Sequence, residues 1–426
     1  HHRGRLLRFR HACATWLSQA AWFSGCVTLV SAPLVWQHFH ILSPISIVTN
    51  VVLGPCLCVA LASGISTVLV GLINEPMSTL PAMMCEISIV AMRRIIELAA
   101  MVPGGHHWLP SPPSAWVLVF YVVLALSLLL PRCTQTRIAR GAWVAVWMTS
   151  AWWMATSPPR LSPGSLEATF VDVGHGTCVV LRLESEQTWL YDCGRLGNAS
   201  FSSRGIDSTL WSMGVTRLDG VFLSHADADH FNALPGILRR FDVRTLYTPP
   251  GMLQEDEPAL RQLLPSIALH GTRVVELSRG DQLATSQITA SVLHPPARRV
   301  GGSDNANSLV LRVDCSRKVL VLPGDLEPPG TDHLMRCQRP PPGGVLMAPH
   351  HGSLRMDAGE VLQWARPRAT VVSGGRRSNR PEVDRMLSAS GSTVHVTHRD
   401  GAVQVTIGDR GEAKIRHWGE SGWEKS

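Results

Sequence analysis

Two long stretches without a charged side chain constrain this chain more than any other feature of its sequence. Residues 12–36 contain no charged residue over 25 positions, and residues 41–73 contain none over 33 positions. About 20 apolar residues cross the hydrocarbon core of a bilayer as a helix, because a helix bonds its backbone groups internally. Buried helices of a large soluble protein are the alternative, but two runs of this length favour a membrane region.

Three further segments before residue 160 extend this region. Residues 114–131 and 141–157 are shorter apolar runs. Residues 78–101 also contain charged side chains, so this segment either spans the bilayer or lies flat as an amphipathic helix. These charges are Glu86, Arg93, Arg94 and Glu97.

The run at 41–73 is too long for one simple span. It contains Asn50 and Pro55 and is interrupted by glycines, and proline disrupts helical hydrogen bonding. We therefore expect a broken or re-entrant helix around these two residues.

The distribution of charge separates the membrane region from the rest of the chain. Residues 1–159 carry nine Arg, no Lys and three acids, a net charge of +6. The whole chain has 39 Lys+Arg and 32 Asp+Glu, which leaves 30 bases and 29 acids, a net +1, for residues 160–426. Near-zero net charge gives no support to a basic nucleic-acid-binding face on the second part. A proline-rich linker leads us to expect a membrane region at 1–157, a linker at 158–166 and a soluble domain at 167–426.

The chain begins with His1-His2 and not with Met. We expect such a start in a fragment or where the first codon has been assigned too late. Two leading histidines are also what a purification tag leaves behind, so they carry no functional interpretation.

After the linker, short β-rich runs alternate with glycine-containing turns and helical stretches. Strands are predicted at 168–173, 178–184, 188–193, 220–225, 309–315, 318–325, 344–350 and 393–398, and helices near 204–214, 231–240, 256–268, 357–365 and 380–389. Strands mixed with helices at this spacing indicate an α/β domain of two sheets with outer layers of helix.

The stretch from His225 to His230 reads His-Ala-Asp-Ala-Asp-His and follows an apolar strand. Alternation in an extended segment places His225, Asp227 and Asp229 on one side, and the turn into the next helix brings His230 alongside. Imidazole and carboxylate groups are ligands for divalent cations. A polar loop that contains these residues by chance is the alternative for this stretch taken alone.

Two later strands end in the same manner. One apolar strand ends in Pro323-Gly324-Asp325, and another ends in Pro349-His350-His351-Gly352. Loops at strand ends present side chains from a rigid sheet. Three such ends in one chain favour a metal site over coincidence.

The HxDxDH, GD and HHGS series resembles the metallo-β-lactamase superfamily, in the variant where aspartate replaces the second histidine of HxHxDH. The whole set of motifs is similar to the C-terminal domain of ComEC-type competence proteins, and the membrane motifs resemble that family's competence-domain helices. The motifs are Asp172-Val-Gly-His-Gly176, Tyr191-Asp-Cys-Gly194, Leu218-Asp-Gly220 and Asn305-Ala-Asn-Ser-Leu309, with Leu42-Ser-Pro-Ile-Ser, Asn50 and Gly54-Pro55 in the membrane part.

The resemblance implies a membrane α-helical region followed by an αββα metallo-β-lactamase-like sandwich that holds two divalent ions, Mn²⁺ or Zn²⁺. His225 and Asp227 would hold one ion, Asp229 and His230 the other, and Asp325 would bridge both. His350 is favoured to complete the second site, with His351 either supporting a ligand or contacting the phosphate. Either Asp172 or Asp192 would orient a ligand from behind, and capping of a turn is the alternative for both.

Several positions depart from the family pattern. His175 and Thr177 replace a glutamine and an acid, and the segment 378–382 lacks the histidine common before its proline. No third-motif histidine precedes Asp325, so Asp304, Asn305 or a water would fill its place. His294 stands before two prolines and is more typical of a turn residue.

Three functions remain open. The leading hypothesis is a metal-dependent phosphodiesterase or nuclease that acts on incoming DNA during natural transformation, with Asp229, Asp325 and His351 as catalytic residues. The second is a DNA-transport component whose hydrolase domain is degenerate, and the third a membrane-tethered hydrolase of esters or lactams. The expected partners are DNA, membrane lipid, and other competence proteins or further copies of the chain.

Arginine placement predicts the orientation in the cytoplasmic membrane. Four arginines precede the first span and three lie near 132–140, whereas the loops at 37–41 and 102–113 have no Lys or Arg. Positive residues collect on the cytoplasmic side. Five spans then place the hydrolase domain outside, and a flat segment at 78–101 would place it inside.

Overall fold

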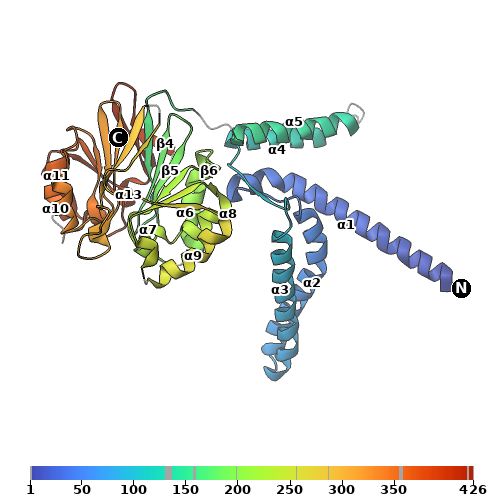
Figure 1. The fold of residues 1–426 in the computed structure, drawn as a ribbon. Coiled ribbons are helices and arrows are strands. Elements are labelled where there is room, and N and C mark those ends of the chain that lie inside the picture. The colour runs from blue at the N-terminus through green and yellow to red at the C-terminus, as the bar shows by residue number, and fades with distance from the viewer. Residues whose placement is uncertain are drawn as a thin grey trace. The chain divides into compact units, whose positions relative to one another are not determined.

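The computed structural model describes residues 2–129, 137–156, 160–197, 199–255, 257–285, 287–354, 358–419 and 422–425. The chain divides into two compact units, His1–Ser157 and Pro158–Ser426 (Figure 1). Each unit has its own buried apolar side chains.

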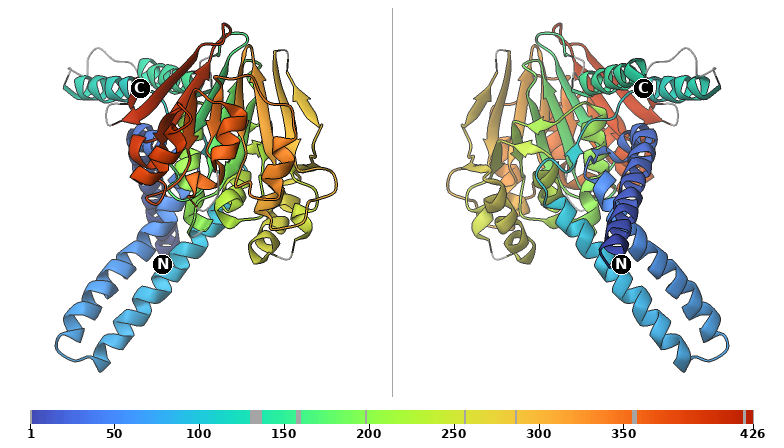
Figure 2. Two further views of the ribbon diagram at one scale, coloured as in Figure 1. Left: turned by 90° about the vertical axis from the view of Figure 1, so that its left-hand side faces the viewer. Right: turned by 90° about the vertical axis from the view of Figure 1, so that its right-hand side faces the viewer.

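The first unit is helical. Its described helices are α1 (His2–Phe39), α2 (Ser46–Gly71), α3 (Thr79–Ala100), α4 (Ser114–Leu129) and α5 (Arg137–Thr156), with the short helix η1 (Pro76–Ser78) and the paired strands β1 (Ile41–Leu42) and β2 (His107–Trp108). Helices α2 and α3 lie side by side as an antiparallel hairpin (Figure 2). By length and composition, α2 is the one helix in the described part of the chain that could cross a membrane, and the apolar helix at Ser114–Ser127 is shorter.

The prediction of a broken or re-entrant helix at 41–73 is wrong. Helix α2 runs without interruption from Ser46 to Gly71 with Pro55 inside it, and the first residues of the apolar run form β1 and a turn. A proline removes one backbone donor, and helices in apolar surroundings tolerate this where neighbouring groups adjust. The length of the run therefore reflects a strand and a turn joined to one 26-residue helix.

The second unit contains two large sheets. The first has the order β10-β9-β7-β5-β4-β3-β18-β19-β20 and the second runs from β11 to β17 in sequence order. The strands are β3 (Leu166–Phe170), β4 (Cys178–Leu183), β5 (Thr188–Cys193), β6 (Arg217–Leu218), β7 (Gly220–Phe222), β8 (Asp242–Val243), β9 (Thr245–Thr248), β10 (Arg273–Glu276), β11 (Gln282–Ala284), β12 (Ile288–His294), β13 (Val310–Cys315), β14 (Lys318–Leu322), β15 (Val345–Met347), β16 (Ala369–Val372), β17 (Thr393–Val396), β18 (Val403–Ile407), β19 (Ala413–Gly419) and β20 (Gly422–Lys425).

Helices cover the outer faces of both sheets (Figure 1). The helices of this unit are α6 (Ala199–Ser212), α7 (Ala228–Phe231), α8 (Leu234–Arg240), α9 (Pro258–His270), α10 (Gly330–Met335), α11 (Ala358–Ala365), α12 (Pro381–Ser388) and α13 (Thr397–Asp400), with the short helices η3 (Met252–Gln254), η4 (Asn305–Asn307) and η5 (Pro349–Gly352). The predicted α/β domain of two sheets with outer helices is confirmed.

Strand β14 shows why the domain folds in layers. Leu320 and Leu322 lie in the core between the two sheets, whereas Val319 and Val321 lie in the core beneath α10, α11 and α12. Successive side chains of a strand point to opposite faces, so an all-apolar strand needs cover on both. Each buried aliphatic side chain contributes roughly 1.5–3 kcal/mol relative to exposure. This packing fixes the end of β14, where Asp325 follows.

Candidate metal centre

The loop after β7 carries four of the predicted ligands. Strand β7 is paired in parallel between β5 and β9, and its chain continues through Ser224 to His225 before α7 begins at Ala228. His225 and His230 are buried, whereas the side chain of Asp227 is 54% exposed. The ends of parallel strands in a rigid sheet thus present these groups at one edge.

At this edge of the domain, the ligand-type side chains form two groups. One contains His225, His230 and Asp325, the other contains His175, Asp229 and His351, and in each the candidate ligand atoms lie within 4.8 Å of one another. Asp325 lies between the groups, because its Oδ1 is 3.3 Å from Nε2 of His230 and its Oδ2 is 3.5 Å from Nε2 of His351. This is the position that a bridging carboxylate requires.

Asp192 orients the histidines of the first group through hydrogen bonds on the side away from their Nε2 atoms. Its Oδ1 accepts the backbone N–H of Ser224 at 2.7 Å, and its Oδ2 accepts the Ser224 hydroxyl at 2.8 Å and Nδ1–H of His230 at 2.8 Å. Since the Ser224 proton points to Asp192, Nδ1 of His225 donates to the Ser224 oxygen at 2.9 Å. In their neutral forms, both imidazoles thereby present the lone pair of Nε2 to the site.

Close approach of the backbone brings Asp192 to the ligand loop. A side chain at Gly194 would place its Cβ 2.0 Å from the backbone of Asp229, so only glycine fits there. The aspartate expected to orient a ligand is therefore Asp192, while Asp172 caps its own turn by accepting the N–H of Gly174 at 3.2 Å.

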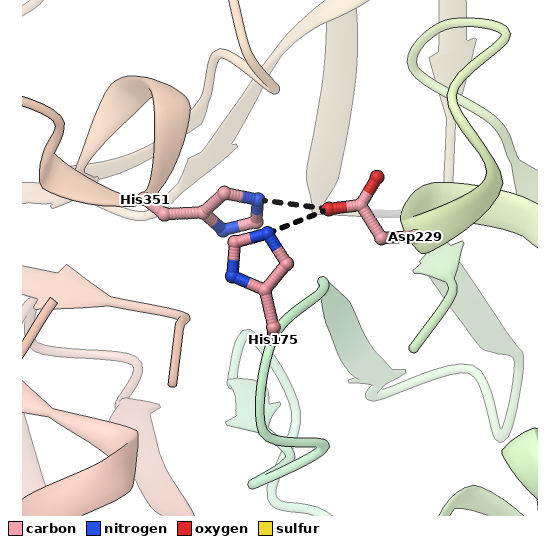
Figure 3. A group of neighbouring side chains, drawn as sticks. All are labelled: His175, Asp229 and His351. Carbon is pink, nitrogen blue, oxygen red and sulfur yellow. Dashed lines mark ion pairs between the residues drawn. The ribbon is translucent and has the colours of Figure 1, made fainter. Parts of the chain in front are cut away.

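His351 belongs to the second group and is fixed in the same way. Its Nδ1–H donates to the carbonyl of Ser373 at 2.7 Å, which leaves the lone pair on Nε2. That Nε2 lies 3.4 Å from Oδ2 of Asp229, and Nε2 of His175 approaches the same oxygen to 3.5 Å (Figure 3). Two segments distant in sequence therefore converge on a carboxylate carried by a third.

The residues present fit a divalent cation. In the described part of the chain, Nε2 of His225, of His230 and of His351 is buried without a hydrogen bond. Buried polar atoms without a partner are rare and costly in folded proteins. Three such imidazole lone pairs beside Asp229 and Asp325 form a donor set of the kind that holds Zn²⁺ or Mn²⁺.

Without a cation, the buried charges hold one another in their ionised forms. Burial lowers the pKa of His230, but Asp325 and Asp192 outweigh it and hold that pKa well above its usual range. Burial likewise raises the pKa of Asp325, yet His351 and His230 outweigh it and hold that pKa well below the usual range. Without a cation, His230 therefore carries a proton that it must lose before Nε2 can bind a metal. This is expected where metal binding releases protons.

His350, the predicted ligand, lies outside both groups. Its side chain is 30% exposed, with Nδ1 3.7 Å from Oδ2 of Asp325 and 3.5 Å from Nδ2 of Asn305. Both His350 and His351 have positive φ, 49° and 53°, and this turn directs His351 inward. Asp227 stands beside His225, with 3.3 Å between Oδ2 and Nε2.

His175 is a site residue that sequence reasoning treated only as a departure from the family pattern. It lies between two glycines after β3, is 41% exposed, and stands within reach of Asp229. Burial and then His351 lower its pKa, against the opposing effect of Asp229. A histidine flanked by glycines at the end of a strand was the available signal.

The third-motif position remains without an imidazole among the described residues of the two groups. Asp304 is paired with Arg299 at 2.9 Å. His294 is buried in β12, where its Nε2–H donates to the carbonyl of Ala306 at 2.9 Å. These residues stabilise the 294–309 segment and are not among the grouped ligand atoms.

A cavity of about 690 Å³ opens over the second group. It is lined by His175, Leu196, Asp227, Asp229, Asp325, His350, His351, Gly352, Ser353, Leu354, Arg377, Ser378, Arg380 and Val383. Its size suits part of an extended polymer or a small molecule.

Comparison with known proteins finds two family models in this chain. The model described as competence protein matches residues 3–133, and the model of the metallo-beta-lactamase superfamily matches residues 171–376. In solved structures, the metallo-beta-lactamase fold protein YhfI from Bacillus subtilis is 11% identical, with a TM-score of 0.36 over 54% of this chain and 96% of that one.

Curated relatives carry both parts in one chain. ComE operon protein 3 of Bacillus subtilis is 26% identical over 418 residues, which cover 93% of this chain and 53% of the relative. Competence protein ComA of Neisseria gonorrhoeae is 28% identical over 309 residues, 70% of this chain and 40% of the relative. The chain thus spans about half the length of the curated relatives it matches. It carries a competence region followed by a metallo-β-lactamase domain, an arrangement consistent with a ComEC-type competence protein.

Proposed function

We propose that the second unit is a metal-dependent phosphodiesterase or nuclease that acts on DNA during uptake through the membrane region. Similarity to competence proteins of DNA uptake, together with a metallo-β-lactamase domain, supports the substrate class. One observation carries the chemistry: three buried imidazole Nε2 atoms face Asp229 and Asp325 without hydrogen-bond partners in the described residues.

Two ions, Mn²⁺ or Zn²⁺, suit the two groups. We assign His225, His230 and Asp227 to one ion and His351, Asp229 and the neighbouring His175 to the other, with Asp325 between them. This proposal places His351 in the ligand role and moves His350 to the phosphate contact, because His350 is the more exposed of the pair and lines the cavity.

Bound cations would lower the pKa of a water and stabilise the attacking and leaving oxygens of a phosphodiester. The chain's own groups position these partners. Asp325 holds the two ligand groups at a fixed separation, and Asp192 fixes the tautomer of His230. Asp229 faces the cavity and can accept the proton of the attacking water.

A DNA-transport component with a degenerate hydrolase domain is the second candidate. It is favoured by the third-motif position, where Asp304 is paired with Arg299 and does not join the ligand groups. In that case the cavity would bind or guide DNA without cleaving it.

Metal analysis and cleavage assays separate the two candidates. The purified chain in detergent would be analysed for bound metal and incubated with single-stranded and duplex DNA in Mn²⁺, Zn²⁺ or EDTA. The nuclease proposal expects cleavage that EDTA abolishes and that Asp325→Asn removes. Asp314→Asn is the matched control. Asp314 lies on β13, outside the site, and its carboxylate pairs with Arg312 at a distance of 2.7 Å. Bound metal without cleavage of either DNA under any condition would favour transport.

We further propose that the membrane region crosses the cytoplasmic membrane five times and places the hydrolase domain outside. Helix α3 lies along α2 in an antiparallel hairpin, so a membrane-crossing α2 brings α3 across with it and does not leave it flat. Its charges are partly neutralised, since Arg93 and Arg94 both pair with Glu97. Of the arginines near 132–140, Arg132 lies outside the described residues.

A reporter tests the orientation. A fusion after Ser426 to a reporter that is active only outside the membrane should be active. A silent fusion, with a cytoplasmic reporter active at the same point, would reverse the proposed orientation.

A further inference from the structure

The loop between β16 and α12 carries three arginines close to the metal centre. Arg377 and Arg380 line the same cavity as Asp229, Asp325 and the neighbouring histidines. Arg376 is also exposed but is not among the residues that line it. The lining of the cavity thus combines the proposed cation-binding residues with two guanidinium groups.

This loop is anchored to the metal centre at its start. The Ser373 carbonyl accepts Nδ1–H of His351, and the Ser373 hydroxyl donates to the carbonyl of Gly176 at 3.2 Å. The next residue, Gly374, donates its N–H to the Thr397 hydroxyl at 3.2 Å. The group that orients the ligand His351 is therefore four residues from Arg377, so the loop positions ligand and arginine together.

Close packing continues along the loop. An added Cβ at Gly375 would lie 3.1 Å from the backbone nitrogen of His175, so the loop runs directly against the turn that carries this residue. Arg380 is the N-cap residue of α12, and its carbonyl accepts the N–H groups of Val383 and Asp384 at 3.0 and 3.2 Å. Both ends of the arginine segment are therefore held by backbone hydrogen bonds.

Arg377 and Arg380 have no ion pair or side-chain hydrogen bond with any residue in the described part of the chain. Other arginines of the domain are engaged: Arg240 pairs with Asp207 at 2.9 Å, Arg299 with Asp304 at 2.9 Å, and Arg399 with Asp384 at 2.7 Å. The carboxylates that share the cavity with Arg377 and Arg380 belong to the proposed metal centre. Two positive groups thus remain available to a ligand.

We propose that Arg377 and Arg380 bind the phosphates next to the one held at the metal centre, and so select a substrate with a charged polymeric backbone. This inference rests on the proposed function, since it places the reacting phosphate at the metal centre. Guanidinium groups bind phosphate oxygens through charge-assisted, bidentate hydrogen bonds. The domain's net charge of +1 gives no broad basic surface, so this pair concentrates positive charge where the substrate is needed.

The test measures binding separately from cleavage. The full chain in detergent, loaded with Mn²⁺, is mixed with fluorescein-labelled tetrathymidylate, and anisotropy is recorded by stopped flow before cleavage contributes. We expect Arg377→Ala and Arg380→Ala each to weaken binding about tenfold and to reduce the salt dependence of log K by about 0.7. Arg376→Ala is the matched control and should bind as the parent does, because it removes the same charge outside the cavity.

A backbone-neutral ligand completes the test. The methylphosphonate analogue of tetrathymidylate should bind with equal affinity to the parent and to the Arg377→Ala, Arg380→Ala double variant, because it lacks the phosphate charges. Equal affinity of parent and double variant for the charged oligonucleotide, including no measurable binding by either, overturns the proposal. The proposal is also overturned if Arg376→Ala weakens binding as much as Arg377→Ala and Arg380→Ala do. Any nearby positive charge would then be enough to explain the binding.

The two proposals fail in different ways. Arginine-dependent binding without cleavage by the parent would retain the phosphate site and refute the nuclease. Cleavage with unchanged binding by the double variant would retain the nuclease and refute the phosphate site.

Discussion

Replacing Asp192 by asparagine should weaken metal binding although Asp192 touches no metal site directly. The variant keeps the shape of the side chain but replaces one oxygen with an NH₂ group. At Oδ1 the carboxylate accepts the Ser224 N–H at 2.7 Å, so the amide oxygen must stay there to avoid two facing donors. The NH₂ group of the variant then faces the Ser224 hydroxyl and Nδ1 of His230. In the parent protein, both of these groups donate to Oδ2 of Asp192.

The consequence is a change of tautomer. His230 can meet the new NH₂ group only by presenting the lone pair of Nδ1, and its proton then moves to Nε2, where the metal should bind. Loss of an orienting carboxylate behind a histidine ligand costs roughly 10–100-fold in metal affinity. That range corresponds to about 1.4–2.7 kcal/mol, in line with the loss of a hydrogen bond to a charged group.

Competition against a chromophoric chelator at pH 7.5 would measure the affinity, with thermal unfolding recorded in parallel to show that the variant folds. Asp172→Asn is the matched control, because Asp172 only caps its own turn and should leave affinity unchanged. A folded Asp192→Asn variant with the parent's affinity would refute the tautomer argument.

Three further predictions follow from the described contacts. Asp229→Ala should remove most bound metal from residues 160–426, measured by elemental analysis, because it deletes the carboxylate that His175 and His351 both approach. Asp325→Asn should abolish DNA cleavage in a gel assay with little change in far-ultraviolet circular dichroism, since the amide keeps its shape but loses the bridging charge. Burial lowers the pKa of His294 from 6.5 to about 4, against the opposing hydrogen bond to Ala306. The unfolded chain then binds the extra proton between those pH values, so stability falls by about 3 kcal/mol as pH drops from 6.5 to 4. Urea unfolding of His294→Gln should lack this acid-dependent loss, and an unchanged acid limb would contradict it.

The ligand types could be predicted because they follow the ends of buried strands. His225 and Asp325 each stand three residues after an apolar strand, and His230 follows five residues after His225 in α7. The sheets that these strands form bring their ends to one edge. The spacing of apolar residues and the chemistry of the side chains are local properties, so both can be determined from the sequence without knowledge of the fold. The same reasoning predicted two sheets with helices outside.

His175 could not be assigned in this way, since its role depends on contacts distant in sequence. His175 reaches Asp229 because the loop after β16 packs against the turn that carries His175. Gly375 of that loop lies next to the backbone of His175. No spacing rule joins residues 175 and 375. The uninterrupted α2 was missed for a related reason, because tolerance of Pro55 depends on surroundings that composition does not report.

The choice between His350 and His351 depended on a backbone conformation that sequence rules disfavour. Both residues have positive φ, 49° and 53°, which is uncommon outside glycine and costs of order 1–3 kcal/mol per residue. This turn makes neighbouring imidazoles point to different places, and the second one reaches Asp229 and Asp325.

That geometry gives a direct test of which histidine binds metal. His350→Gly and His351→Gly both relieve a positive φ, so their effects on backbone strain are matched, and glycine's extra unfolded-state entropy offsets part of the gain in each. Of these two histidines, only His351 supplies a buried Nε2 without a hydrogen bond to the described residues. We expect His350→Gly to retain the parent's metal content, with unfolding free energy within about 1 kcal/mol of the parent. His351→Gly should lose at least one ion. Retention of metal by His351→Gly together with loss by His350→Gly would return the ligand role to His350, and the left-handed turn would then have to rearrange on binding.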